Sequence, residues 1–196
     1  MKLLIIGCGG IGSHFIDETI KQIENGQLNA EIVIADDDIV EPEQLSYQSF
    51  KVQDVGLNKA ECKKNHYTSK QGIVIEAMRK RIRKSDEIKG YDFIVLCVDN
   101  EQTRTAIIQA CHKIGMPFLD LRSSGRRIMA TPKLQTLSSN LKFIDQDDTK
   151  KYSCQEKTDL LEGRINIGNK IVAFIGVQML LNHARGHTNI PQTLSM

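Results

Sequence analysis

The sequence predicts an α/β protein: a Rossmann-like, doubly wound, mostly parallel sheet with an antiparallel C-terminal extension and a long C-terminal helix. Over the first two-thirds of the 196 residues, short aliphatic runs alternate with amphipathic segments, as in parallel strands connected by helices. Hydrophobic residues make up 40% and charged residues 26%, as in ordinary globular domains. We expect one domain over residues 1–196, with its core in residues 1–130 and an extension in residues 131–196.

The individual elements follow from side-chain periodicity. Residues 3–6 are consecutive aliphatic residues, which predicts a buried strand. After a glycine-rich turn, residues 11–24 repeat apolar side chains at helical spacing until Asn25-Gly26 ends the helix. The same alternation predicts strands at 31–35, 72–77, 92–98 and 117–121, and helices at 58–67 and 102–113.

The extension has a different pattern. Residues 126–137 indicate an antiparallel strand and turn, residues 138–163 are polar without clear periodicity, and residues 166–184 form a long apolar helix. Apolar side chains lie on more than one face of this helix, which exceeds what packing on one sheet requires. We therefore expect a subunit interface there and a homodimer.

Charge and hydropathy exclude several classes of protein. The net charge of +2 is too balanced for a general polyanion partner. The one strong cationic cluster, residues 79–84 (RKRIRK), lacks interleaved aromatic residues, so we expect a solvated connector rather than a nucleic-acid site. No apolar run approaches the roughly 18 residues of a membrane span. The first eight residues imitate a lipoprotein signal, but their apolar run is only residues 3–6.

The five cysteines form no CxxC pair, so neither a disulfide framework nor a structural zinc is expected. Three of them lie in segments that are expected to be buried. This usage fits a reducing compartment, and we expect a cytoplasmic protein. The five histidines show no spacing typical of a metal site.

The glycine-rich turn is the first segment that indicates chemistry. Gly7, Gly9, Gly10 and Gly12 stand between a strand and a helix. Glycine lets a ligand approach the backbone closely, and the free N–H groups of a helix N-terminus attract a phosphate. The pattern predicts nucleotide binding without saying which nucleotide. A purely structural turn is the alternative.

Carboxylates follow two of the expected strands. Asp36 and Asp38 come after the second strand, where an acid accepts hydrogen bonds from ribose hydroxyls and disfavours a 2′-phosphate; Asp37, between them, is expected in a solvated turn. Asp99 follows the strand at 92–98 and is a natural Mg²⁺ ligand at the carboxyl edge of the sheet. The alternative is a helix cap, a role that Asn100 can take instead.

Lys59 is expected in the first turn of the helix that Asn58 begins. A cation is unfavourable at a helix N-terminus, so Lys59 is expected to have an anionic partner. A phosphate and the acidic turn at residues 36–38 are both candidates, and an exposed lysine on a polar helix is the simpler alternative.

Together these segments resemble the ThiF/MoeB family, the adenylating fold of ubiquitin-activating enzymes. The family pattern of GxGGxGS, DxDxVE, NLxRQ, GxxKA and a T/V-D-N with a following Arg appears here in register. It reads GCGGIGS at 7–13, DDDIVE at 36–41, QLSYQ at 44–48, GLNKA at 56–60, and VDN at 98–100 with Arg104. Several motifs in order are far more specific than a glycine turn alone.

The resemblance implies a function and a set of roles. A carboxylate would attack the α-phosphate of ATP, giving an acyl-adenylate and pyrophosphate. Asp36 would contact ribose, Lys59 the phosphates, Asp99 would hold Mg²⁺, and Gln48 and Arg104 would line the site. The family's usual acyl substrate is the C-terminus of a ubiquitin-like protein, so a ubiquitin-like or peptide partner is expected.

The sequence also departs from the family. Tyr47 replaces the motif's Arg and Gln44 its Asn, and a phenol cannot pair with phosphate as a guanidinium does. Arg122, Arg126 or Arg127 are candidate replacements. We do not expect the family's N-terminal helix. These departures favour an alternative hypothesis, a nucleotide-binding scaffold without catalysis. An NAD-dependent oxidoreductase is a third hypothesis, but no hydride-transfer site is visible.

Cys154 is the one cysteine outside the expected core elements, in a polar stretch with two nearby lysines. Members of the family often carry a nucleophilic cysteine in this region, and lysines lower a thiol's pKa. A nucleophile that takes the acyl group as a thioester and a partly buried structural cysteine are both compatible with the sequence.

Overall fold

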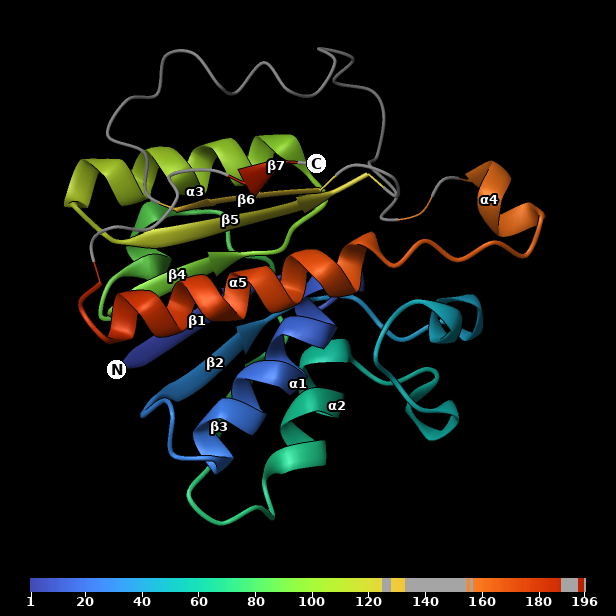
Figure 1. Cartoon of the computed structure of the whole chain (residues 1–196), viewed down its shortest axis with the longest axis horizontal. Helices are drawn as coiled ribbons and strands as arrows, with labels where there is room; N and C mark the ends of the chain where they lie inside the picture. Colours follow the sequence, from blue (N-terminus) through green and yellow to red (C-terminus); the bar gives the residue numbers. More distant parts are fainter. Residues whose placement is uncertain (125–127, 133–154, 156, 188–193, 196) are drawn as a thin grey trace.

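The computed structural model describes residues 1–124, 128–132, 155, 157–187 and 194–195. Its centre is a seven-stranded sheet in the order β3-β2-β1-β4-β5-β6-β7 (Figure 1). The first five strands in the chain are parallel, and the last two are antiparallel to their neighbours. The strands are β1 (Lys2–Ile6), β2 (Glu31–Ala35), β3 (Val74–Met78), β4 (Phe93–Leu96), β5 (Phe118–Ser123), β6 (Ile128–Pro132) and β7 (Leu194–Ser195).

Helices cover both faces of this sheet. The described α-helices are α1 (Gly10–Glu24), α2 (Lys59–Tyr67), α3 (Glu101–Ile114), α4 (Lys157–Leu161) and α5 (Gly168–Ala184). Phe15 of α1 and Val172 of α5 share one apolar cluster with Leu3 of β1, whereas Ile107 of α3 packs with Leu4 in a second cluster. Successive residues of β1 therefore face opposite layers, as a doubly wound sheet requires.

The strand order reverses at β1. From β1 the chain adds β2 and β3 on one side, then crosses back to add β4 and β5 on the other. In open α/β sheets, ligands bind at this switch point, outside the carboxyl ends of the strands. The turns after β1, β2, β3 and β4 all open on that edge, which Figure 1 shows at the arrowheads of the strands.

The fold class predicted from the sequence is confirmed, including the antiparallel pairing after β5 and the long helix α5. The boundaries differ by a few residues: the strand expected at 72–77 is Val74–Met78. The sequence analysis did not predict the two-residue strand β7, the short helix α4 in a stretch without periodicity, or the 3-10 helices at Pro42–Ser46, Val52–Asp54 and Ser85–Ile88. The division at residue 130 stays a prediction. In the described residues, no helix is both long and apolar enough to cross a bilayer.

Candidate functional site

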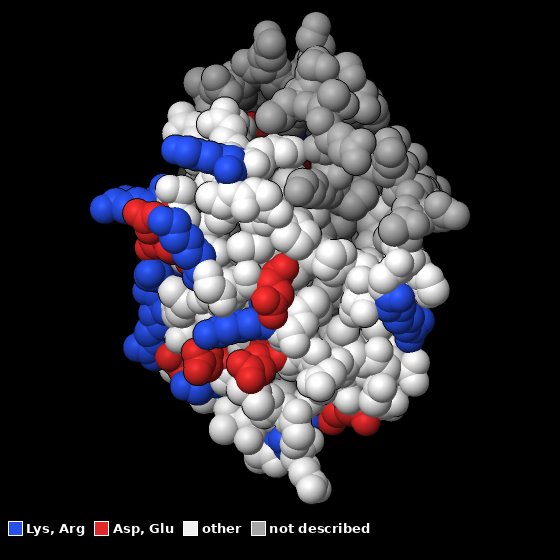
Figure 2. Space-filling model, turned by 90° about the vertical axis from the view of Figure 1, so that its left-hand side faces the viewer, with Lys and Arg blue, Asp and Glu red and all other residues white. Residues whose placement is uncertain are grey.

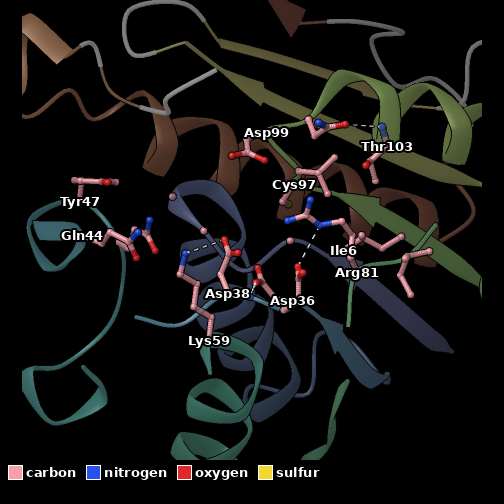
Figure 3. A pocket seen from close by; sticks show the side chains of 18 residues that line it. Ile6, Asp36, Asp38, Gln44, Tyr47, Lys59, Arg81, Cys97, Asp99 and Thr103 are labelled. Carbon is pink, nitrogen blue, oxygen red and sulfur yellow. Dashed lines mark hydrogen bonds and ion pairs between the residues drawn. The ribbon is translucent and has the colours of Figure 1, made fainter. Parts of the chain in front are cut away.

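A pocket of about 200 Å³ opens at the switch point, between the glycine turn and the ends of β2 and β4 (Figure 3). Its walls come from six separate parts of the sequence, 6–10, 36–38, 44–48, 59, 81–82 and 97–103, that the fold brings to one edge of the sheet. The residues singled out from the sequence that line it are Gly7, Gly9, Gly10, Asp36, Asp38, Gln48, Lys59 and Asp99.

Two glycines make the turn before α1 possible. Gly7 has a φ of +94°, and a Cβ there would lie 2.8 Å from the carbonyl carbon of Cys97. A Cβ on Gly12 would lie 2.0 Å from the carbonyl oxygen of Gly7, so Gly12 allows the turn to pack closely. Gly12 does not itself line the pocket. No side chain caps the N-terminus of α1. Its free N–H groups and dipole therefore favour an anion.

Asp36 ties the acidic turn to the glycine turn. Its side chain accepts hydrogen bonds from the backbone N–H of Cys8 at 2.5 Å and of Asp38 at 2.8 Å. Burial of the carboxyl group raises its pKa, and these two N–H donors oppose the shift. The carboxylate is therefore held in place at the end of β2 before any ligand binds.

Lys59 reaches the pocket through a capped helix. The side chain of Asn58 accepts from the N–H of Glu61 at 3.1 Å, and it donates to the carbonyls of Asp36 and Asp38, each at 3.0 Å. The Lys59 side chain is buried, and its Nζ lies 3.4 Å from Oδ2 of Asp38. Of the two anionic partners considered, the acidic turn is the one in this structure. Figure 3 shows this amine facing the pocket.

Asn100, and not Asp99, caps the helix α3. Asn100 caps α3 by accepting a hydrogen bond from the N–H of Thr103 at 2.8 Å. Asp99 is exposed at the pocket and pairs with none of the described residues. Its carboxylate oxygens are therefore open to a ligand, as a Mg²⁺ site requires.

The loop that carries Gln44, Tyr47 and Gln48 forms another wall of the pocket. Gln48 is 8% exposed, and its Oε1 has no hydrogen-bond partner among the described residues. A buried amide oxygen without a partner costs free energy. A ligand with a hydrogen-bond donor would satisfy it.

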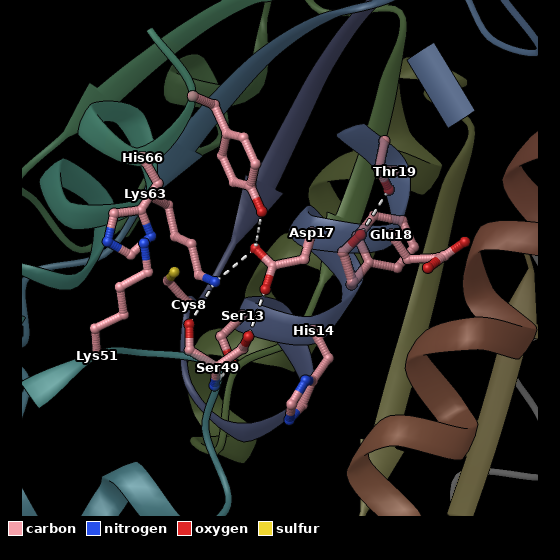
Figure 4. A network of polar contacts seen from close by, with 12 residues as sticks. Cys8, Ser13, His14, Asp17, Glu18, Thr19, Ser49, Lys51, Lys63 and His66 are labelled. Carbon is pink, nitrogen blue, oxygen red and sulfur yellow. Dashed lines mark hydrogen bonds and ion pairs between the residues drawn. The ribbon is translucent and has the colours of Figure 1, made fainter. Parts of the chain in front are cut away.

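A buried polar network holds this loop against the helices (Figure 4). Asp17 of α1 accepts from Lys63 Nζ at 2.6 Å, from the Tyr67 hydroxyl at 2.7 Å and from Ser49 Oγ at 2.5 Å. The N–H of Ser49 also donates to Ser13 Oγ at 3.0 Å. Burial raises the pKa of Tyr67, and the charge of Asp17 adds to the shift. No sequence motif indicated this network.

Arg104 does not line the pocket, although the family resemblance implied that it would line the nucleotide site. Its buried guanidinium bonds to the Asp120 carboxylate and to the Val98 carbonyl, and it is not among the residues that line the pocket. Asp120 stands on β5, the strand beside β4, and captures the guanidinium there. Arg122 does not line the pocket either: its Nε lies 2.7 Å from Asp120, and its Nη1 lies 3.2 Å from Glu101. Arg104 thus holds the segment after β4, and Arg122 joins β5 to the start of α3.

Comparison with known proteins identifies the family to which this chain belongs. The family profile described as "ThiF family" matches residues 1–195. The chain belongs to the ThiF family. No curated protein matches the sequence significantly.

Solved structures share the fold of this ThiF-family chain at low identity. Escherichia coli MccB has a TM-score of 0.75 and 17% identity, over 100% of this chain and 58% of that one. MccB solved with ATP has a TM-score of 0.70 and 21% identity, over 95% and 56%. PaaA has a TM-score of 0.71 and 16% identity, over 100% and 60%. The chain thus spans about 60% of the length of these proteins.

Some expected site residues of this ThiF-family chain are not described. Cys154 lies outside the described residues, as do Arg126 and Arg127. The described cysteines, at 8, 62, 97 and 111, are buried. Burial is the main cause that raises the pKa of the Cys8 thiol, so this cysteine of the glycine turn is not a reactive thiolate.

Sequence reasoning gave no site role to Ile6, Arg81, Ile82, Cys97 or Thr103, and all five line the pocket. Arg81 belongs to the cationic cluster that we expected to be a solvated connector, and its Nε lies 3.3 Å from Oδ1 of Asp37. The charge cluster itself was the one available signal. Counting formal charges, four lining aspartates outweigh Lys59 and Arg81, so the lining residues carry 2 − 4 = −2.

Proposed function

We propose that this chain binds ATP with Mg²⁺ and activates a carboxylate as an acyl-adenylate. The observation that carries the proposal is the convergence of the in-register motif residues on one pocket at the switch point. Residues from 7 to 99, far apart in the sequence, line this pocket. They supply the uncapped N-terminus of α1, the carboxylate of Asp36 for a ribose, the buried Lys59 and the exposed carboxylate of Asp99.

The pocket offers complementary groups to each part of a nucleotide. The N-terminus of α1 would receive the phosphates, and Asp36 would accept hydrogen bonds from ribose. Lys59 would turn from Asp38 toward the phosphates, at little cost because Asp38 is 58% exposed. Gln48, in the buried wall of the site, would donate a hydrogen bond to the nucleotide or accept one from it.

The residues present also fit a divalent cation. A polyanionic ligand meets a wall with a formal charge of −2, and Asp99 presents a carboxylate without a described partner. Asp99 would hold Mg²⁺ through oxygen. When bound, the ion supplies charge neutralisation for the phosphates.

The reaction needs positioning more than proton transfer. The substrate's ionised carboxylate attacks the α-phosphorus, a bond forms between them, and the bond from that phosphorus to the bridging oxygen breaks. Pyrophosphate leaves with the electron pair, so no proton has to move. Lys59 and the N–H groups of α1 would stabilise the charge that develops on the phosphates.

The acyl substrate we propose is the C-terminus of a peptide or a ubiquitin-like protein. MccB, the microcin C7 biosynthetic enzyme, was solved with N-formylated MccA, which supports a peptide. We also propose a homodimer, because Ile167, which precedes α5, and Ile171 and Phe174 of α5 are 62%, 38% and 53% exposed. A cytoplasmic location and a nucleophilic role for Cys154 remain proposals from the sequence.

A second candidate function is a nucleotide-binding scaffold without catalysis. Tyr47 occupies the place of the motif's Arg at the pocket, and Arg104 and Arg122 are both engaged with Asp120. Among the described residues, Arg81 is the guanidinium that lines the pocket. A site with less cationic charge at the phosphates would bind nucleotide and turn over slowly.

The test measures ligand-induced thermal stabilisation and ATP–pyrophosphate exchange. Wild type is compared with Asp99→Asn, with Lys59→Met and with the exposed control Lys51→Ala. We expect ATP to stabilise wild type only with Mg²⁺, and both pocket variants to lose most of the effect. Wild type that ATP–Mg²⁺ fails to stabilise contradicts the proposal. Nucleotide binding without exchange, over a panel of peptides with free C-termini, favours the scaffold.

A further inference from the structure

The pocket has two chemically different ends. The glycine turn, Asp38, Lys59 and Gln48 form a polar end. Ile6, Ile82 and Val98 form an apolar end, and all three pack in the cluster that lies on the α3 face of the sheet. Phosphates and ribose suit the polar end. A flat heteroaromatic base suits the apolar end, because such a ring gains most from contact with apolar surface.

Arg81 stands at the rim of the apolar end. Its neighbour Ile82 is fully buried and anchors this segment in the core, which fixes where Arg81 leaves the backbone. The Arg81 side chain is 45% exposed, and its ion pair with Asp37 joins two half-exposed groups. Figure 3 shows the Arg81 guanidinium among the residues that line the pocket.

The other cations of the segment do not line the pocket. Arg79 pairs with Glu61 at 3.6 Å, and Lys80 pairs with Glu87 at 2.9 Å, and neither lines the pocket. Figure 2 shows mixed positive and negative side chains over one face of the molecule. The cluster is therefore not a uniform cationic patch, and Arg81 differs from its neighbours in its place.

Arg81 is also distant from the expected phosphate position. It follows β3, which is separated from β1 and its glycine turn by β2. Two strand spacings amount to about 10 Å. A nucleotide whose phosphates lie at the N-terminus of α1 and whose ribose lies at Asp36 would thus bring its base toward Arg81.

We propose that Arg81 recognises the base: on nucleotide binding its guanidinium leaves Asp37 and lies against the ring face at the apolar end of the pocket. The inference rests on the proposed function. A guanidinium is planar and stacks on aromatic faces. The ion pair it leaves is exposed and holds it weakly. Because the contact grows with ring area, a purine is favoured over a pyrimidine.

The experiment compares affinities for ATP–Mg²⁺, AMP and CTP–Mg²⁺ by titration calorimetry. The variants are Arg81→Ala, Arg81→Lys and the matched control Lys80→Ala, which changes the adjacent cation at 46% exposure. We expect Arg81→Ala to weaken ATP and AMP by one common factor of about 2- to 30-fold, and CTP by less. Arg81→Lys should lose part of the affinity, and Lys80→Ala should lose none.

The outcomes separate this inference from the function it rests on. Equal ATP affinity in wild type and Arg81→Ala overturns the inference and leaves the proposed function standing. A loss for ATP that AMP does not share makes Arg81 a phosphate ligand and also overturns it. Wild type that binds no ATP overturns both. Urea unfolding of each variant checks that exposed substitutions leave the fold intact.

Discussion

The Nζ of Lys63 lies 2.6 Å from Oδ1 of Asp17, and this pair of a buried amine with a partly buried carboxylate joins α2 to α1. The same amine donates to the carbonyl of Ser49 at 2.6 Å, one residue after Gln48. The loop that forms one wall of the candidate site is thus fixed by a charge that does not touch the ligand. The Lys63 side chain is 1% exposed, so its amine depends on these partners to compensate for its lost hydration.

We predict that Lys63→Ala lowers the free energy of unfolding by about 3–5 kcal/mol, because it leaves Asp17 without its cation. Urea unfolding measures the change. The control Lys21→Ala removes a lysine that is 60% exposed and pairs with Glu18, and it should stay within about 0.5 kcal/mol of wild type. A Lys63→Ala protein as stable as that control would show that the network carries no stability.

Substitutions at Gly12 and Gly9 test two different roles of the glycine turn, which are close packing and access for a ligand. A Cβ on Gly12 meets the Gly7 carbonyl oxygen at 2.0 Å, whereas a Cβ on Gly9 meets nothing within 4 Å. We predict that Gly12→Ala costs about 1–3 kcal/mol of stability, and that Gly9→Ala changes it by less than about 0.5 kcal/mol. Both should weaken ATP, Gly9→Ala because its methyl group occupies the phosphate approach. If Gly9→Ala binds ATP like wild type, the phosphates lie elsewhere.

Much of the fold could be predicted from the sequence because its signals are local. The aliphatic run of β1, the glycine turn and the Asn58 and Asn100 caps each depend on a few adjacent residues. The parallel topology then brings the ends of the strands to one edge, so the motif residues share a pocket without further information.

The rest of the site depends on contacts between distant positions, which one sequence does not show. Arg104 meets Asp120, which is 16 residues away on the adjacent strand. Arg81 enters the pocket because its neighbour Ile82 is buried in the core, while the cluster around it has the composition of a solvated connector. The network around Asp17 spans up to 50 residues.

Arg104 is a test of a structural role against a ligand-binding one. We predict that Arg104→Met lowers stability by about 1.5–3 kcal/mol, because the Val98 carbonyl loses its buried donor and Asp120 keeps only Arg122 of its two arginines. The ATP affinity of the folded variant should stay within about threefold of wild type, since Arg104 does not line the pocket. Unfolding and calorimetry together give both numbers. A stable variant with a large loss of ATP affinity would return Arg104 to the ligand.

The pH dependence of stability should report the contact between His14 and the loop that carries Tyr47. Its Nε2 lies 3.2 Å from the Tyr47 carbonyl oxygen. Burial lowers the His14 pKa, the bond to Tyr47 opposes the shift, and the charge of Lys170 adds to it. A lowered pKa in the folded state means that His14 contributes stability above its unfolded pKa of about 6.5. That contribution is lost as the pH falls through the lowered value.

We therefore predict that His14→Gln, which keeps a donor for the Tyr47 carbonyl, loses less stability than wild type between pH 7.5 and pH 5. Urea unfolding at intervals of about half a pH unit measures the difference, and His187→Gln, at an exposed position, is the matched control. His183, whose pKa burial also lowers, is present in every variant and cancels from the comparison. An offset between His14→Gln and wild type that is constant with pH would mean that protonation of His14 is not what loosens the loop.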